Sequence, residues 1–416
     1  MDQPFQAAHG RARGVESAIV ERPKRSSPGH RAACAAGIAW IAAPGLAQAH
    51  VRWFSQVADD SMPPAPLTTL LSSPLFIALL LLAMAVIGCV RAVDARLAAG
   101  NPRLMHLQRR IDSRMSQWAA PVLRVGCALF FAAIALYYAR EPITLTAELK
   151  SPTSWVLPVQ LAIAGAILFR AGVIPACAGM VLLYLYSAHL YGIVHMIDYH
   201  LFLGLCVFLA LDRLSQRHGE AIGLLVLRVL VSTSFLWVGI EKWLYPEWTC
   251  DILKNQLPTI AMGLPPHFWA MSAGFVEVAL AFLMLFGGLS SQVAAGVLLS
   301  MLAVAIPAVG AVDAIGHLPM MFPLFILATT RNRLPRRVPE HAAWHPLDLC
   351  SLFLIAVTGL TGLYFLTHEF ASAKQLHVAQ IWPDVTVALL ASTALATWVM
   401  RAVLQQRRTP ARARRR

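Results

Sequence analysis

Nine ionisable side chains gather near one end of the long apolar segments of this sequence. They are His189, His195, Asp198, His200, Glu241, Lys242, Glu277, Asp313 and His317. An ionisable group inside an apolar membrane segment costs roughly 2.5 to 3.5 kcal/mol on insertion scales, so its placement is informative. The clustering predicts a polar site that looks toward one side of a membrane.

Histidine and aspartate in this set suggest metal chemistry. His195, Asp198 and His200 open one segment. A mixed nitrogen and oxygen ligand set for copper, zinc or iron could be completed by His317, Asp313, His189 or His50. His200 and His317 are also the pair that could bind a cofactor such as haem. Proton transfer and a purely structural role at helix ends are the competing interpretations.

Glu241 and Glu277 are the candidate catalytic carboxylates. Glu277 lies about nine residues into its segment, roughly 13 Å along a helix, where a carboxylate must be neutral, paired or hydrated. Lys242 or His317 is the expected partner, and quinol oxidation or proton movement would use such a group as a base. A packing contact between helices is the alternative for Glu277, and an interfacial pair with Lys242 is the alternative for Glu241.

Composition places these residues in a bilayer. Of 416 residues 58% are hydrophobic and only 13% are charged, which is too apolar for an ordinary water-soluble protein. The formal charge of +13 comes from basic residues in loops, as the positive-inside rule produces, and does not indicate nucleic-acid binding.

Hydropathy predicts an all-α, polytopic transmembrane bundle of about eleven helices. The expected spans are 74–93, 119–138, 155–169, 172–190, 195–211, 221–241, 268–287, 291–311, 315–330, 347–367 and 381–400. Loop charge predicts a cytoplasmic C-terminus in a bacterial inner membrane. Arg124 and Arg228 are expected to snorkel to headgroups, and Trp243, Tyr245, Trp248, Trp269 and Tyr364 are among the aromatics expected at the outer interface.

The amino terminus has the order of a secretory signal. Basic residues precede an apolar stretch at 32–46 and an Ala47-Gln48-Ala49 cleavage site. Cleavage there would leave His50 as a periplasmic amino terminus able to bind copper; the alternative is that His50 is simply the residue after the cleavage site. An uncleaved helix is the alternative, but fifteen residues would give only roughly 22 Å.

An internal repeat organises the spans. Gln160 precedes His200 by forty residues, Glu277 precedes His317 by the same interval, and Val122-Leu123-Arg124-Val125 corresponds to Leu227-Arg228-Val229. Two tandem four-helix units with the same orientation follow. The predicted segments are 1–49 (leader and signal), 50–73 (periplasmic), 74–118 (first helix and basic cytoplasmic loop), 119–211 (unit 1), 221–330 (unit 2), 347–400 (two C-terminal helices) and 401–416 (basic cytoplasmic tail).

The second unit resembles the DoxX/DoxD-like family of four-helix membrane proteins. The resemblance is carried by Phe235-Leu236-Trp237-Val238-Gly239-Ile240-Glu241-Lys242-Trp243, Gly274-Phe275-Val276-Glu277 and Leu283-Met284-Leu285-Phe286-Gly287-Gly288. It implies a redox-linked membrane role, with a quinone or a periplasmic redox protein as partner. The cofactor stays open among quinone, copper and haem, the last two suggested by the histidines above. A proton- or ion-coupled transporter and a non-catalytic assembly subunit are the alternatives.

Overall fold

The computed structural model describes residues 63–215, 219–255, 263–286, 288–331, 346–371 and 384–395. Across these residues the chain is helical and contains no strand, apart from an isolated bridge between Ile143 and Lys150. The all-α prediction is confirmed. The predicted signal, His50 and the basic tail lie outside the described residues.

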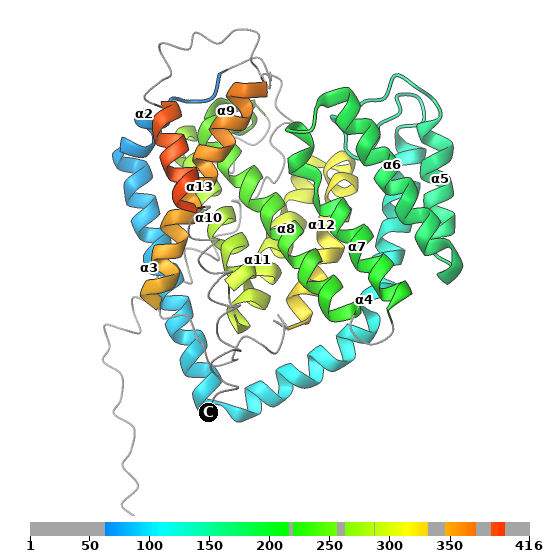
Figure 1. Cartoon of the computed structure of the whole chain (residues 1–416), viewed down its shortest axis with the longest axis horizontal. Helices are drawn as coiled ribbons and strands as arrows, with labels where there is room; N and C mark the ends of the chain where they lie inside the picture. Colours follow the sequence, from blue (N-terminus) through cyan, green and yellow to red (C-terminus); the bar gives the residue numbers. More distant parts are fainter. Residues whose placement is uncertain are drawn as a thin grey trace, which may run out of the picture.

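Figure 1 shows the arrangement of the described helices. In chain order they are α2 (Leu67–Ser72), α3 (Pro74–Gly100), α4 (Pro102–Tyr137), α5 (Val156–Ala166), η2 (Arg170–Gly172), α6 (Val173–Tyr191), η3 (His195–Tyr199), α7 (Leu201–Leu214), α8 (Gly219–Leu244), α9 (Pro246–Asn255), α10 (Pro266–Phe286), α11 (Leu289–Val309), α12 (Ala311–Thr329) and α13 (Pro346–Ala371). A last helix covers Asp384–Leu395.

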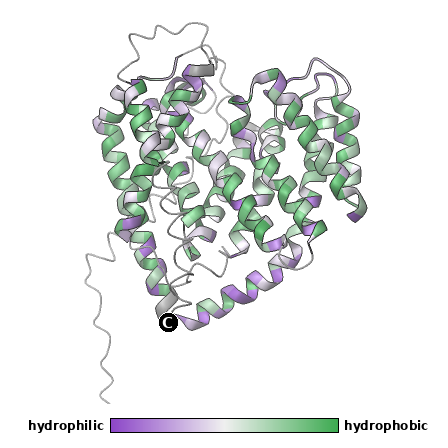
Figure 2. Cartoon of the chain, viewed as in Figure 1, coloured by the Kyte–Doolittle hydropathy of each residue, from purple (hydrophilic) through white to green (hydrophobic). Residues whose placement is uncertain are grey.

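Each of the eleven predicted spans overlaps one of these helices. Within the described residues, seven helices are long and apolar enough to cross a membrane, and Val156–Ala166, Ala314–Thr329 and Asp384–Leu395 are shorter apolar helices. The chain is therefore an integral membrane protein. Figure 2 shows apolar residues covering the bundle and polar residues concentrated at its two ends and along the first half of α4.

The basic loop expected within 94–118 is not a loop. α3 continues to Gly100, and α4 begins at Pro102 after a break of one residue. Asn101 makes the break because its side chain accepts a hydrogen bond from the Leu104 amide, which caps the new helix. Hydropathy ends a span where charge begins, but a charged helix continues beyond that point.

The eight helices from α4 to α12, leaving out α9, pack as two groups of four. In the first, α4 contacts α5 and α7, and α6 lies between α5 and α7; in the second, α8, α10, α11 and α12 pack in the same cyclic order. The groups meet where α7 lies on α8 and where α12 lies on α4. This reciprocal pairing is what a two-fold relation between two equivalent units requires.

The end of the bundle that carries α9 is called the α9 end, and the end where α4 begins is called the α4 end; these lie at the top and bottom of Figure 1. α3 and α13 pack beside the second group, with α3 on α10 and α13 on both α3 and α8. α8 therefore lies at the centre, with neighbours from both groups and from α13. Its charged residues Arg228, Glu241 and Lys242 are therefore buried among helices.

Two arginines near the α4 end bind helix carboxyl termini. Arg228 on α8 is 2% exposed and donates to Ser291 Oγ, to the Met284 carbonyl at 3.4 Å and to the Thr330 carbonyl at 3.2 Å. Arg124 on α4 donates to the carbonyl of Ile167 at 2.7 Å and to that of Leu168, just after α5. The expectation of snorkelling is wrong for Arg228, whose charge is held by the carbonyls that end α10 and α12.

α8 and α10 approach closely because both carry glycine at the contact. A Cβ atom on Gly274 would lie 2.3 Å from Trp243 Nε1 and 2.7 Å from the Gly239 carbonyl oxygen. Because Gly274 has no side chain, Trp243 Nε1 can reach the Met271 carbonyl, to which it donates at 3.2 Å. Small residues serve helix contacts in membranes in this way.

Gly274→Ala should destabilise the folded protein by about 2 kcal/mol because the added methyl overlaps the indole and a carbonyl. Thermal unfolding of the detergent-solubilised protein measures the effect. Gly296→Ala is the matched control, since the nearest atom to its new Cβ is 3.9 Å away. Equal unfolding temperatures for the two variants would contradict the close contact of α8 with α10.

Arg228→Met should lower stability by about 3 kcal/mol, because buried carbonyls at the ends of α10 and α12 lose their donor. Arg124→Met should cost only about 1 kcal/mol, since Arg124 is half-buried and water can replace its hydrogen bonds. Both variants are compared by unfolding in the same detergent. A larger loss for Arg124→Met would overturn the assignment of Arg228 as a buried cap.

Candidate functional site

A buried ion pair joins α8 to α10. Lys242 Nζ donates to Glu277 Oε2 at 2.7 Å, and the side chains are 0% and 1% exposed. The sequence predicts Lys242 or His317 as the partner of Glu277, and in the structure the partner is Lys242. The second carboxylate oxygen of Glu277, Oε1, is buried and has no hydrogen-bond partner within the described part of the chain.

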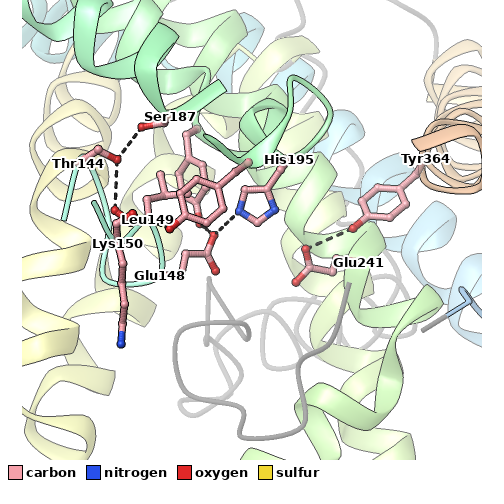
Figure 3. Close-up of polar contacts among 10 residues, drawn as sticks. Thr144, Glu148, Leu149, Lys150, Ser187, His195, Glu241 and Tyr364 are labelled. Atoms are coloured by element: carbon pink, nitrogen blue, oxygen red, sulfur yellow. Dashed lines mark hydrogen bonds and ion pairs between the residues drawn. The ribbon is translucent and has the colours of Figure 1, made fainter. Parts of the chain in front are cut away.

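Glu241 precedes Lys242 but binds a different helix. Neighbouring residues on a helix project about 100° apart, and Glu241 Oε2 accepts a hydrogen bond from the Tyr364 hydroxyl of α13 at 3.3 Å (Figure 3). Glu241 is also buried. The expected interfacial pair between Glu241 and Lys242 is therefore wrong: both side chains are in the interior, and Lys242 forms its ion pair with Glu277.

Aromatic rings surround Glu241. The rings of Tyr364 and His368 stack at 4.3 Å with an interplanar angle of 5°, and the Trp237 ring lies 4.6 Å from that of Tyr364. Toward the α9 end, Tyr245 stacks on Trp248 at 4.3 Å. Five of the aromatics expected at the outer lipid interface are instead buried because they pack between helices, namely Trp243, Tyr245, Trp248, Trp269 and Tyr364.

Trp237 brings a polar atom into this aromatic group. It lies one helical turn before Glu241, so the two side chains share a face of α8. Its indole Nε1 is buried, and no acceptor for it exists among the residues that the structure describes. We call Trp237, Glu241, Tyr364 and His368 the α8–α13 cluster.

A second polar network lies on the first group of helices. His195 Nε2 is 3.0 Å from Glu148 Oε1, and the Tyr199 hydroxyl donates to the same oxygen. Glu148 belongs to the segment between α4 and α5, while His195 and Tyr199 belong to η3, which packs on α8. Figure 3 shows His195 reaching Glu148 on one side of the view and Glu241 reaching Tyr364 on the other.

Hydrogen bonds fix the segment that carries Glu148. The Gln160 side chain of α5 donates to the carbonyls of Ile143 and Thr144, and the Thr144 hydroxyl lies 2.6 Å from that of Ser187 on α6 (Figure 3). Gln160 is buried. In the predicted repeat it occupies the position of Glu277, so an amide holds a loop where the other unit has an ion pair.

The predicted metal and cofactor residues take separate positions. His200 directly precedes α7, and its side chain contacts the Ile197 carbonyl and the Thr233 hydroxyl. Asp198 is buried in η3, and His317 is buried in α12. Asp313 lies on α12, and His50 is outside the described residues. Within the described ranges, no three His, Cys, Asp or Glu side chains are grouped so that they could hold a metal ion.

Cys250 on α9 is the thiol closest in sequence to Glu241. Burial, with a further contribution from the negative charge of Glu247, raises the pKa of Cys250 to about 11. The thiol is therefore protonated at neutral pH. It is neither a nucleophile nor a thiolate ligand in this state.

Comparison with known families places the ion pair in a recognised unit. Residues 223–311 match the family model DoxX. The chain contains a DoxX domain. It runs from α8 to the start of α12 and includes Trp237, Glu241, Lys242 and Glu277. No match was found among curated proteins or among solved structures.

The DoxX domain supplies only part of the α8–α13 cluster. Tyr364 and His368 belong to α13, outside residues 223–311. Sequence reasoning found Glu241 and Glu277 through their unusual position in apolar segments, but it missed Trp237, His368 and Glu148. A histidine four residues after a tyrosine near a helix end is the one signal that could have indicated the stacked pair on α13.

Breaking the ion pair from one side should destabilise the protein strongly. Lys242→Met or Glu277→Leu alone leaves one buried charge without its partner and should cost about 3 to 5 kcal/mol, whereas the double variant should recover most of the loss. Chemical unfolding in detergent of the four proteins in the cycle measures the coupling. Additive losses in the double variant would show that the two side chains do not interact.

Proposed function

We propose that this protein is a redox-linked membrane protein whose DoxX domain and α13 together bind a substrate of the quinone class. The α8–α13 cluster forms the site, and the Lys242–Glu277 pair lies beside it on α8. The observation that carries the proposal is the buried Trp237 indole N–H, which has no acceptor among the described residues and lies on the same helix face as Glu241. A buried donor of this kind needs an acceptor.

A quinone fits the chemistry of these residues. Its planar ring can stack on aromatic side chains, and the cluster contains three of them. The Tyr364 ring centroid lies 4.6 Å from that of Trp237 and 4.3 Å from that of His368. A carbonyl oxygen of the ring would accept a hydrogen bond from Trp237 Nε1. An apolar molecule of this class reaches a buried site directly from the bilayer.

The bound quinone would supply two-electron redox chemistry, and the chain would handle the protons. Glu241 and the Tyr364 hydroxyl already form a hydrogen bond at 3.3 Å, which is a route for a proton. The stacked His368 continues toward the end of α13.

The orientation of the site follows from charge. Arg96, Arg103, Arg109, Arg110 and Arg114 lie on α3 and α4 near the α4 end. The positive-inside rule then assigns the α4 end to the cytoplasm of a bacterial inner membrane and the α9 end to the periplasm. Glu148, His195 and the α8–α13 cluster belong to the periplasmic part of this arrangement.

A proton- or ion-coupled transporter is the second candidate. It is favoured by the Lys242–Glu277 pair itself, because a buried pair between two helices can open and close as its carboxylate gains or loses a proton. In this case the same residues would form a path across the bundle, and no ring-shaped ligand would be needed.

Quinone binding is tested on the purified protein in lipid nanodiscs. Ubiquinone and menaquinone analogues are titrated while retained quinone is measured by extraction and chromatography. Trp237→Phe removes one hydrogen bond and keeps the ring, so it should weaken binding about tenfold, and Glu241→Gln should change the pH dependence of reduction. Asp94→Asn is the matched control, because it alters a buried carboxylate at the α4 end.

Two results would reject the redox assignment. One is an equal affinity for quinone in the wild type, Trp237→Phe and Asp94→Asn proteins. The other is no quinone binding together with a proton flux into proteoliposomes that Glu277→Gln abolishes, which would establish the transporter instead.

A further inference from the structure

α4 is too long to be only a membrane crossing. Its 36 residues correspond to about 54 Å of helix, against the ~30 Å of a bilayer core. Pro121 stands inside it, where proline removes a backbone hydrogen bond and permits a change of direction. Figure 1 shows the first part of α4 running across the α4 end before the helix rises into the bundle.

The residues before Pro121 form three distinct faces. One face is buried against the bundle and includes Gln108, Asp112 and Ala119. About 100° away, Leu107, Ile111 and Trp118 form an apolar stripe, exposed by 53%, 42% and 60% respectively. The remaining circumference is polar, and its exposed basic residues are Arg103, Arg109, Arg110 and Arg114.

Polar contacts fix this part of α4 to the rest of the protein. Gln108 Nε2 donates to Gln292 Oε1 on α11, and Asp112 Oδ1 accepts from the Arg331 amide at 2.9 Å, directly after α12. Asp94 of α3 accepts from the amides of Gly288 and Leu289, both at 3.0 Å, and thereby caps α11. The orientation of the apolar stripe is therefore set by contacts with the DoxX domain and with the end of α12.

We propose that residues 102–118 form an interfacial helix that binds the headgroups of anionic phospholipids. A helix with an apolar stripe, a tryptophan and flanking arginines fits the boundary between acyl chains and headgroups. The buried face is already occupied by the bundle, so the stripe is the side left for acyl chains. The arginines then lie at the level of the lipid phosphates, where the negative surface potential of the membrane attracts each basic residue.

The site recognises a phosphate diester with a net negative charge. Arginine binds phosphate through two parallel hydrogen bonds as well as through charge. Arg103, Arg110 and Arg114 border the apolar stripe at intervals that place them along one side of the helix. A bound lipid would therefore insert its chains along Leu107 and Ile111 and its phosphate among these side chains.

The test uses the full chain in vesicles of phosphatidylcholine alone or mixed with phosphatidylglycerol. Native mass spectrometry of the extracted protein counts retained phosphatidylglycerol. Replacing Arg103, Arg109, Arg110 and Arg114 by glutamine should reduce this retention about tenfold, and the corresponding lysine variant should keep most of it. Equal retention by the glutamine variant, or no preference of the wild type for phosphatidylglycerol, would overturn the proposal and leave an acidic protein surface as the partner.

A second measurement checks the orientation of the helix independently. In a background with the seven native cysteines replaced, Leu107→Cys and Ser113→Cys are labelled with a water-soluble maleimide. Ser113 is exposed on the polar side, so it should react about tenfold faster than Leu107→Cys in vesicles. Equal rates would show that the stripe faces water and would reject an interfacial helix.

Discussion

The Lys242–Glu277 ion pair is the constraint on which the second half of the bundle depends. Neither charge can be hydrated at this depth, so the two helices must approach closely enough for a 2.7 Å contact. Gly239 and Gly274 allow that approach. α3 completes the enclosure, because Phe76 packs edge-on against Trp243 and Phe275. The resulting interior buries both charged side chains, which are 0% and 1% exposed.

Much of the fold could be predicted from sequence because hydropathy responds directly to the bilayer. Eleven apolar segments were expected, and each overlaps a helix. The errors arise where a residue's partner is distant in sequence. Arg228 lies near a predicted span end, where the sequence fits snorkelling as well as a buried cap. Only the fold shows that the carbonyls of Met284 and Thr330, at the ends of α10 and α12, lie beside it. Hydropathy also cannot distinguish a basic loop from a basic helix, so residues 94–118 were assigned wrongly.

The carboxylates of the candidate site, Glu241 and Glu277, could be predicted from the sequence, but Trp237, His368 and the pairing of the side chains could not. Glu277 was expected to bind Lys242 or His317, and the structure gives Lys242. Glu241 was expected beside Lys242, yet its bond goes to Tyr364, which lies 123 residues later on a helix outside the DoxX domain. No periodicity relates two such positions. The metal set that includes His200, His317 and His50 stays a prediction, with His50 beyond the described residues.

The two arginine caps allow the units to be compared position by position. Arg124 and Arg228 bind the carbonyls of Ile167 and Met284, and the same number of residues beyond each arginine leads to Tyr137 in α4 and Glu241 in α8. α4 ends at Tyr137, whereas α8 continues to Leu244; likewise α5 begins eleven residues before Ile167, but α10 begins eighteen before Met284. In the predicted repeat, the exposed Tyr137 at the end of α4 thus corresponds to the buried Glu241 of α8. The longer α8 and α10, with α9 packed on both, bury a carboxylate and an ammonium at a level that the shorter helices of the predicted first unit leave exposed.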